Sequence, residues 1–182
     1  IVLDILAHNN WERPLYFVTG YHDDAFGLEE YFQLEGLAYR LLPVKSQNKS
    51  WLDYGRIDPD ILYENMVNKF VWGGVNSNGV NIDYNHRRTL IVVKARYNYA
   101  RLSNALSGKG EKEKALKVLD HCMNLLPVEK ISYDMYIPDI IEAYFKAGNA
   151  DKATGLAQGL RDHYFALLDY YLAQDPYIMS SA

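Results

Sequence analysis

The sequences GEKEKALKVLDHCMNLLP at residues 110–127 and GNADKATGLAQGL at residues 148–160 decide the fold. Each begins with Gly and carries Lys four positions later and Ala five positions later, and the second copy follows the first by 38 residues. A fixed offset of this size is typical of an internal repeat, and the small Ala permits two helices to pack closely. Because one such unit cannot bury its apolar face alone, residues 87–171 are predicted to form two stacked helical hairpins.

The apolar spacing of three and four residues predicts four helices in this stretch, at residues 88–107, 111–126, 134–147 and 150–173. Residues 128–133 are expected to connect the hairpins, and Asp134 to cap the helix that Pro138 helps to start. The side chains predicted to face inward are Leu90, Val93, Tyr97, Ala100, Asn104, Ala115, Val118, Leu119, Cys122, Leu126, Ile140, Ile141, Tyr144, Ala147, Ala153, Leu156, Ala157, Leu160, Tyr164, Leu167, Leu168 and Tyr171.

The distance from Gly to Ala, and from Ala to Pro127 twelve residues later, resembles that of a tetratricopeptide (TPR-type) unit. This resemblance implies antiparallel helical hairpins that leave a concave surface for binding another protein. From the repeat register, the residues predicted on that surface are Tyr97, Asn104, Glu142 and Phe145. The last helix, 150–173, is expected to cover the end of the stack.

The first 82 residues show a different pattern. Residues 1–8 are apolar on nearly all sides, which predicts a buried helix, and residues 15–18 and 32–44 have strand-type composition. Asp58-Pro59 is a helix start, with Asp as the cap, and this helix is expected to end at Gly73-Gly74. The predicted fold class is therefore α+β, with a small α/β cap at 1–82 followed by a TPR-like helical domain at 83–182.

Composition limits the possible functions. The net charge of −4 gives no electrostatic case for binding nucleic acid. The lone Cys122 excludes an intrachain disulfide, and core packing is the better interpretation of it than a nucleophile, because the side chain of His121 diverges from it on a helix. No apolar run approaches the ~20 residues of a membrane helix. The abrupt apolar beginning at Ile1 suggests a piece of a longer polypeptide.

Three motifs resemble one family. They are NNWERPLYF at residues 9–17, a block with GL at 27–28, Tyr31 and EGLAYRLLP at 35–43, and a helical part with Arg96, Tyr99, Arg101-Leu102 and the run from Gly110 to Asp120. The family is a group of bacterial multi-pass membrane proteins, long of unknown function, whose membrane part is similar to protein O-mannosyltransferases. By this resemblance the chain is the part that follows the last membrane span.

The resemblance implies a glycosyltransferase-like parent that uses lipid-linked sugar. Its catalytic acid would lie in a loop of the transmembrane half, so no catalytic residue is assigned in this chain. The resemblance also implies a position on the periplasmic face of the inner membrane. There the chain would bind an acceptor polypeptide or brace its own membrane domain, the latter as a purely structural or self-associating module.

Few side chains suggest chemistry of their own. Asp23-Asp24 with Glu29-Glu30 show no metal-ligand spacing, and His22 and His86 have no Cys or His partner nearby. These residues are interpreted as solvated charges, and no metal or cofactor is predicted.

Trp11, Arg13, Tyr39 and Arg40 leave two interpretations open. A Trp beside an Arg suits stacking on a sugar or clamping a carboxylate, whereas in a structural role Trp11 fills the core and Arg13 caps helix carbonyls. Sixteen tyrosines in 182 residues suit either peptide and glycan contacts or helix packing. A glycan-binding module is therefore a further alternative.

Overall fold

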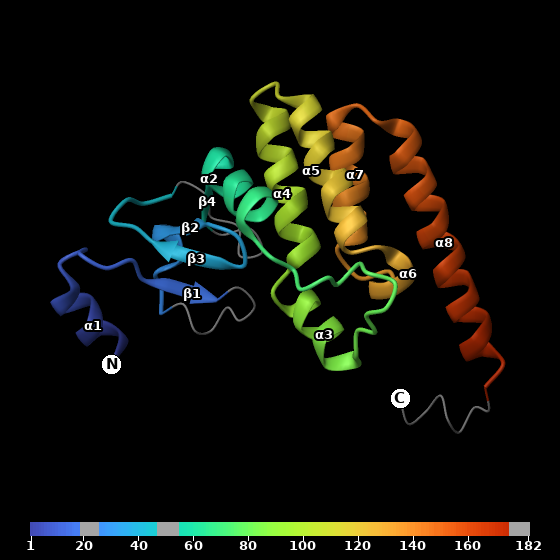
Figure 1. Cartoon of the computed structure of the whole chain (residues 1–182), viewed down its shortest axis with the longest axis horizontal. Coiled ribbons are helices and arrows are strands. Elements are labelled where there is room, and N and C mark those ends of the chain that lie inside the picture. Colours follow the sequence, from blue (N-terminus) through green and yellow to red (C-terminus); the bar gives the residue numbers. More distant parts are fainter. Residues whose placement is uncertain (19–25, 47–54, 175–182) are drawn as a thin grey trace.

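The computed structural model describes residues 1–18, 26–46 and 55–174. A small sheet lies at one end of the molecule and a layer of helices at the other, so the α+β fold class is confirmed (Figure 1). None of the described helices combines the length and the apolar character that crossing a bilayer requires.

The sheet has four short strands, β1 (Tyr16–Val18), β2 (Phe32–Leu34), β3 (Ala38–Leu41) and β4 (Arg56–Ile57), in the order β1-β3-β2-β4. The β3 strand is antiparallel to both β1 and β2, and β4 is parallel to β2. The stretch predicted as extended at 32–44 is thus a pair of strands, and the chain reverses at Gly36, which has a φ of 133°. The β4 strand was not predicted, because two residues carry no alternation.

One face of the sheet belongs to the core, with Phe32, Leu34, Tyr39 and Leu41 all buried, and η2 (Glu29–Tyr31) leads into β2. The helix α1 (Val2–Asn9) contradicts the prediction of a buried helix, since none of its residues is buried and Leu3 is 72% exposed. The left-handed Asn10 and Trp11 turn the chain between α1 and β1, and α1 stands apart at the edge of the molecule (Figure 1). The apolar composition of residues 1–8 therefore correctly indicated a helix but did not show whether another element covers it.

The helix α2 (Pro59–Tyr63) begins as predicted, because an Asp58 carboxylate oxygen accepts hydrogen bonds from the backbone N–H groups of Asp60 and Ile61. It continues as a π-helical segment, η3 (Glu64–Lys69), and ends at Phe70, earlier than the expected Gly73.

The helix predicted at 88–107 is two helices, α3 (Tyr84–Val92) and α4 (Ala95–Gly108). Lys94 between them has a φ of 55°, a left-handed conformation that ends one helix and redirects the chain. The predicted stripe holds only in part: Ala100 is buried and Leu90 and Val93 pack against the core, but Tyr97 and Asn104 are only half-buried. The fully buried Tyr99, Leu102 and Leu106 were not predicted. Because α4 packs against α2, α3, α5 and α7, it is covered on most sides and has no single apolar face.

Both predicted hairpins are present, formed by α4 with α5 (Lys112–Leu125) and by α7 (Ile137–Ala147) with α8 (Ala150–Leu172). The turns place Gly110 and Gly148 at φ values of 85° and 93°, which explains the repeated Gly. The inward residues predicted for α5 are all buried. The connection at 128–133 contains one more short helix, α6 (Val128–Ile131).

The inward stripe predicted for α8 holds only at its beginning. Ala153 is buried, but Tyr164, Leu168 and Tyr171 are 51%, 51% and 46% exposed. The reason is length, since α8 has 23 residues and α7, against which it packs, has 11. The C-terminal half of α8 extends past α7 and stands clear of it (Figure 1).

A single cluster of buried residues joins the sheet, α2 and the hairpins, from Phe32 to Ala153. The division into domains at residue 82 and the TPR-type assignment of the repeat both stay predictions.

Candidate functional site

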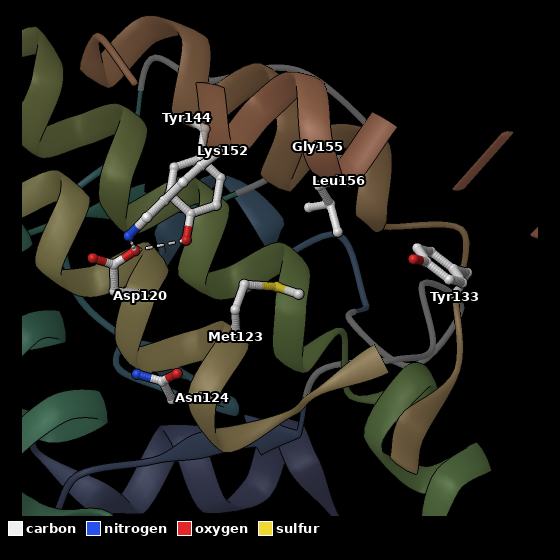
Figure 2. A pocket seen from close by; sticks show the side chains of 8 residues that line it. All are labelled: Asp120, Met123, Asn124, Tyr133, Tyr144, Lys152, Gly155 and Leu156. Atoms are coloured by element: carbon white, nitrogen blue, oxygen red, sulfur yellow. Dashed lines mark hydrogen bonds and ion pairs between the residues drawn. The ribbon is translucent and has the colours of Figure 1, made fainter. Parts of the chain in front are cut away.

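A pocket of about 500 Å³ opens between the two hairpins (Figure 2). The helices α5, α7 and α8 and the loop before α7 contribute its lining, which consists of Asp120, Met123, Asn124, Tyr133, Tyr144, Lys152, Gly155 and Leu156. The hairpin repeat therefore builds a concavity from helices that are far apart in the sequence.

The polar side of the pocket is centred on Asp120. One carboxylate oxygen of Asp120 accepts a hydrogen bond from the Tyr144 hydroxyl at 2.9 Å and pairs with the Lys152 ammonium at 2.6 Å (Figure 2). Burial, and then the hydrogen bond to Asp120, raise the pKa of Tyr144. Tyr144 consequently remains a protonated donor, and the charges of Asp120 and Lys152 compensate one another. Such a cluster suits hydrogen bonding to a ligand better than proton transfer.

The other side of the pocket is apolar and aromatic. Met123 and Leu156 lie between the Asp120 cluster and Tyr133, which stands across the pocket (Figure 2). The Tyr133 ring lies 5.1 Å from the ring of His163 on α8. A Cβ on Gly159 would overlap the Tyr133 hydroxyl, so the absence of a side chain there makes room for this tyrosine.

A second group of polar side chains crosses the sheet. Tyr16, Arg40, Gln33 and Arg56 are successive partners on the strands β1, β3, β2 and β4, so they form a row. Glu35 accepts hydrogen bonds from the Tyr16 hydroxyl at 2.8 Å and the Gln33 amide at 2.7 Å. The pKa of Tyr16 is raised, mainly by this bond to Glu35. The Arg56 Nε donates to the Gln33 amide oxygen at 2.7 Å, so hydrogen bonds connect this row from β1 to β4.

The residues predicted from the first motifs do not converge on one site. Trp11 is 54% exposed and therefore does not fill the core, and Arg13 is also exposed. Tyr39 is 1% exposed and stacks on Phe32, which leaves no surface for a ligand. Arg40 is partly exposed and pairs with Glu35 at 3.7 Å.

The residues predicted on the concave surface are also dispersed, and none of them lines the pocket. Tyr97 contacts the ring of Tyr136 at 5.5 Å, and Asn104 is half-buried on α4. On α7, Glu142 pairs with Lys146 at 2.6 Å and Phe145 is 51% exposed.

The prediction from sequence did not include Asp120 and Lys152 among the candidate site residues, and it assigned Tyr144 only to the core. A signal for Lys152 was present, because it matches Lys114 in the repeat. Lys114 likewise pairs with a carboxylate outside its own hairpin, that of Asp60 at 3.4 Å. The repeated Lys thus marks an ion pair between packed units.

Among residues 1–18, 26–46 and 55–174, no group of three His, Cys, Asp or Glu side chains is arranged to hold a metal ion. His86 is bound to Asp83 at 2.8 Å. His22, Asp23 and Asp24 lie outside the described residues. Cys122 is buried, and its burial raises the pKa of the thiol to about 12, so it packs in the core as predicted.

Comparison with known proteins gives one finding. Residues 1–61 match the family model described as TMEM260-associated domain 2. The match includes α1, all four strands and the beginning of α2, and it ends before the hairpins. No curated protein and no solved structure matches the chain.

Proposed function

We propose that this chain is a non-catalytic accessory domain of a membrane glycosyltransferase-like protein, and that the pocket between its hairpins binds a segment of the acceptor polypeptide. The pocket itself is the observation that carries the proposal. Its volume of about 500 Å³ is in the range of sites that take a few side chains rather than a whole domain.

The lining suits a polypeptide. The apolar side of the pocket, with Tyr133, Met123 and Leu156, offers contact to a side chain of the peptide. The polar side offers its backbone an acceptor, the carboxylate of Asp120, and two donors, the Tyr144 hydroxyl and the Lys152 ammonium group. Tyrosine is favoured at protein interfaces because it combines a large apolar ring with a hydroxyl, and methionine because it adapts its shape.

Two further observations support the assignment of the chain to a membrane glycosyltransferase-like protein. The matched family is named for a TMEM260-associated domain, and the motifs at residues 9–17 and 35–43 resemble a family of membrane glycosyltransferase-like proteins. In this proposal the chain is an extramembrane part of that protein. We place it on the periplasmic face of the inner membrane, next to its own membrane domain.

The alternative function is bracing of that membrane domain, and α1 favours it. Ile1, Leu3 and Ile5 of this segment are 99%, 72% and 46% exposed, and they belong to the part that matches the family. Exposed apolar groups of this kind require a partner surface.

The experiment uses the full-length parent protein in membranes and measures two quantities, the sugar transferred to acceptor protein and the amount of parent protein. Leu156→Glu places a charge in the pocket, and Phe145→Ser changes an apolar residue on α7 that is more exposed than Leu156 and does not line the pocket. Acceptor binding predicts that Leu156→Glu lowers transfer at least roughly tenfold at an unchanged amount of parent, while Phe145→Ser leaves both unchanged.

Bracing predicts the opposite result. Substitution of Leu3 and Ile5 by Ser would then lower the amount of parent protein, and pocket variants would transfer sugar normally. Glycan binding at Trp11 would appear as a change of tryptophan fluorescence on sugar titration that Trp11→Ala abolishes.

A further inference from the structure

The second half of α8 exposes an unusual quantity of apolar surface. Its exposed apolar residues are Tyr164, Phe165, Leu167, Leu168, Tyr170, Tyr171 and Leu172, with exposed fractions from 38% to 68%. A helix that terminates a helical stack ordinarily carries a polar outer face. The first half of α8 packs on α7 and covers it, but the C-terminal half leaves its apolar side chains exposed.

We propose that a second copy of the chain covers these side chains, and that the two α8 helices pair antiparallel through their C-terminal halves. The stripe made of Leu160, Tyr164, Leu167 and Tyr171 has spacings of four, three and four residues. In α8 this stripe continues the face on which Ala153 packs in the core beside α7. The proposed interface thus prolongs a packing surface that the molecule already uses.

The stripe is complementary to itself under two-fold rotation. With the axis passing between Phe165 and Ala166, Leu160 faces Tyr171 of the second copy, and Tyr164 faces Leu167 of the second copy. Each of these facing pairs then consists of one tyrosine ring and one leucine, and this alternation of large and small side chains lets the two helices interdigitate. A two-fold pairing also closes on itself and does not propagate into a filament.

The charges are compatible with this pairing. At roughly 100° per residue, Asp162 and Asp169 lie on the side of α8 opposite the stripe, so the two copies do not bring them together. Arg161 borders the stripe and pairs with Asp162 of its own helix at 2.7 Å. The interface is therefore formed by apolar side chains without a buried unpaired charge.

The area of the stripe indicates the strength of the dimer. A half-exposed Tyr presents roughly 100 Å² of surface, so the two tyrosines of the stripe present roughly 200 Å² and its two leucines add less. This area is well below the ~800 Å² per partner of a standard stable interface. The expected dimer is accordingly reversible and depends on concentration.

The experiment is sedimentation equilibrium of the 182-residue chain at concentrations from about 10 to about 500 µM, a range that covers the dissociation constants of weak dimers. The expected result is a reversible monomer–dimer equilibrium. Leu167→Lys is expected to raise the dimer Kd at least roughly tenfold, because it places a charge in the centre of the stripe. Phe165→Ser is the control, since it removes an apolar side chain that is more exposed than Leu167, at 58% against 38%, and lies away from the stripe. It is expected to change the Kd less than roughly twofold.

Crosslinking tests the orientation. The buried Cys122 does not compete, so a chain with Tyr164→Cys is mixed with a chain with Leu167→Cys under oxidising conditions. Antiparallel pairing predicts that the mixed disulfide forms faster than either chain links to itself, whereas self-linked Tyr164→Cys as the main product would contradict it. A chain that stays monomeric over the whole range, or a Phe165→Ser variant that weakens the dimer as much as Leu167→Lys, would overturn the proposal. Leu167 does not line the pocket, so these outcomes leave acceptor binding separately testable.

Discussion

The helices α4 and α8 distribute their side chains in opposite ways. The helix α4 buries the charged residues Arg96 and Arg101 at 1% and 5% exposure, whereas α8 exposes Phe165 and Leu168 at 58% and 51%. Position explains the difference, because α4 is the centre of the helical layer and α8 is its edge (Figure 1). Burial in this protein therefore follows the number of neighbours of a helix rather than the hydrophobicity of its sequence.

The buried cations of α4 are tolerated because both terminal nitrogens of each guanidinium group are hydrogen-bonded, although the buried Nε of Arg96 has no hydrogen-bond partner among the described residues. The Arg96 guanidinium donates to the carbonyls of Ser132 and Leu126, and it pairs with Asp134 at 2.8 Å. It thereby ties the start of α4 to the end of α5 and to the loop that enters α7. Arg101 likewise donates to the backbone carbonyl of Gly55 at 3.0 Å and so links α4 to the start of β4.

The largest effect on the free energy of unfolding is expected from breaking the buried Arg96–Asp134 pair. Arg96→Met leaves the Asp134 carboxylate buried without its cation, and loss of one partner of a buried pair costs about 3–5 kcal/mol. Chemical denaturation measures the free energy of unfolding. The double variant Arg96→Met with Asp134→Leu is expected to recover part of the loss, since the uncompensated charge is gone. If Arg96→Met were as stable as the unsubstituted chain, the Arg96–Asp134 pair would not stabilise the fold.

The second prediction compares one leucine from each helix. Leu106→Ala in α4 removes a side chain that is 0% exposed, and a loss of about 2–5 kcal/mol is expected from the lost burial and the cavity. Leu168→Ala in α8 removes a half-exposed side chain, and a change within about 0.5 kcal/mol is expected. Thermal and chemical unfolding of dilute protein measures both, because dilution keeps association at α8 from contributing. Equal losses would mean that α8 is packed more tightly than its exposure indicates.

The sequence was sufficient to predict the hairpins, because their information is local. Gly110 and Gly148 each end a helix in the left-handed conformation, and Ala115 and Ala153 are both buried, so the repeat register and the geometry agree. The cap at Asp58 was predictable for the same reason. The break at Lys94 was not, since an ordinary lysine with a left-handed backbone leaves no mark in the periodicity.

The candidate site was predictable only in part, because it depends on contacts between distant elements. Asp120 and Lys152 are 32 positions apart, and their pairing follows from how the hairpins stack. Periodicity identified the apolar stripe of α8, but it could not indicate that α7 ends before Tyr164 has a neighbour. Periodic spacing predicts which face of a helix is apolar, and the lengths of the adjacent helices decide whether that face is covered.

The third prediction uses two glycines of α8 that differ in their surroundings. A Cβ on Gly155 meets no atom, so Gly155→Ala is expected to raise the free energy of unfolding by about 0.5–1 kcal/mol through better helix propensity. Gly159→Ala is expected to lose this gain, because its methyl group overlaps the Tyr133 hydroxyl. Chemical denaturation measures both. In a Tyr133→Ala background the Gly159 substitution should become stabilising, and a gain already present with Tyr133 intact would place this ring elsewhere.

The smallest expected effect concerns His121 on α5, which lies against α4 with its ring 5.8 Å from that of Tyr99. Burial lowers the pKa of His121 in the folded chain. The unfolded chain therefore binds this proton first as the pH falls, and the free energy of unfolding should decrease below the ordinary histidine pKa of about 6.5. Since the carboxylates Asp60 and Asp83 have pKa values lowered below 3.8, they titrate outside this range. Chemical denaturation at several pH values between about 7.5 and about 5.5 measures how the free energy of unfolding changes with pH. This dependence should be weaker for His121→Gln than for the unsubstituted chain. Equal dependence in the two chains would mean that water reaches the His121 ring at this face of α4.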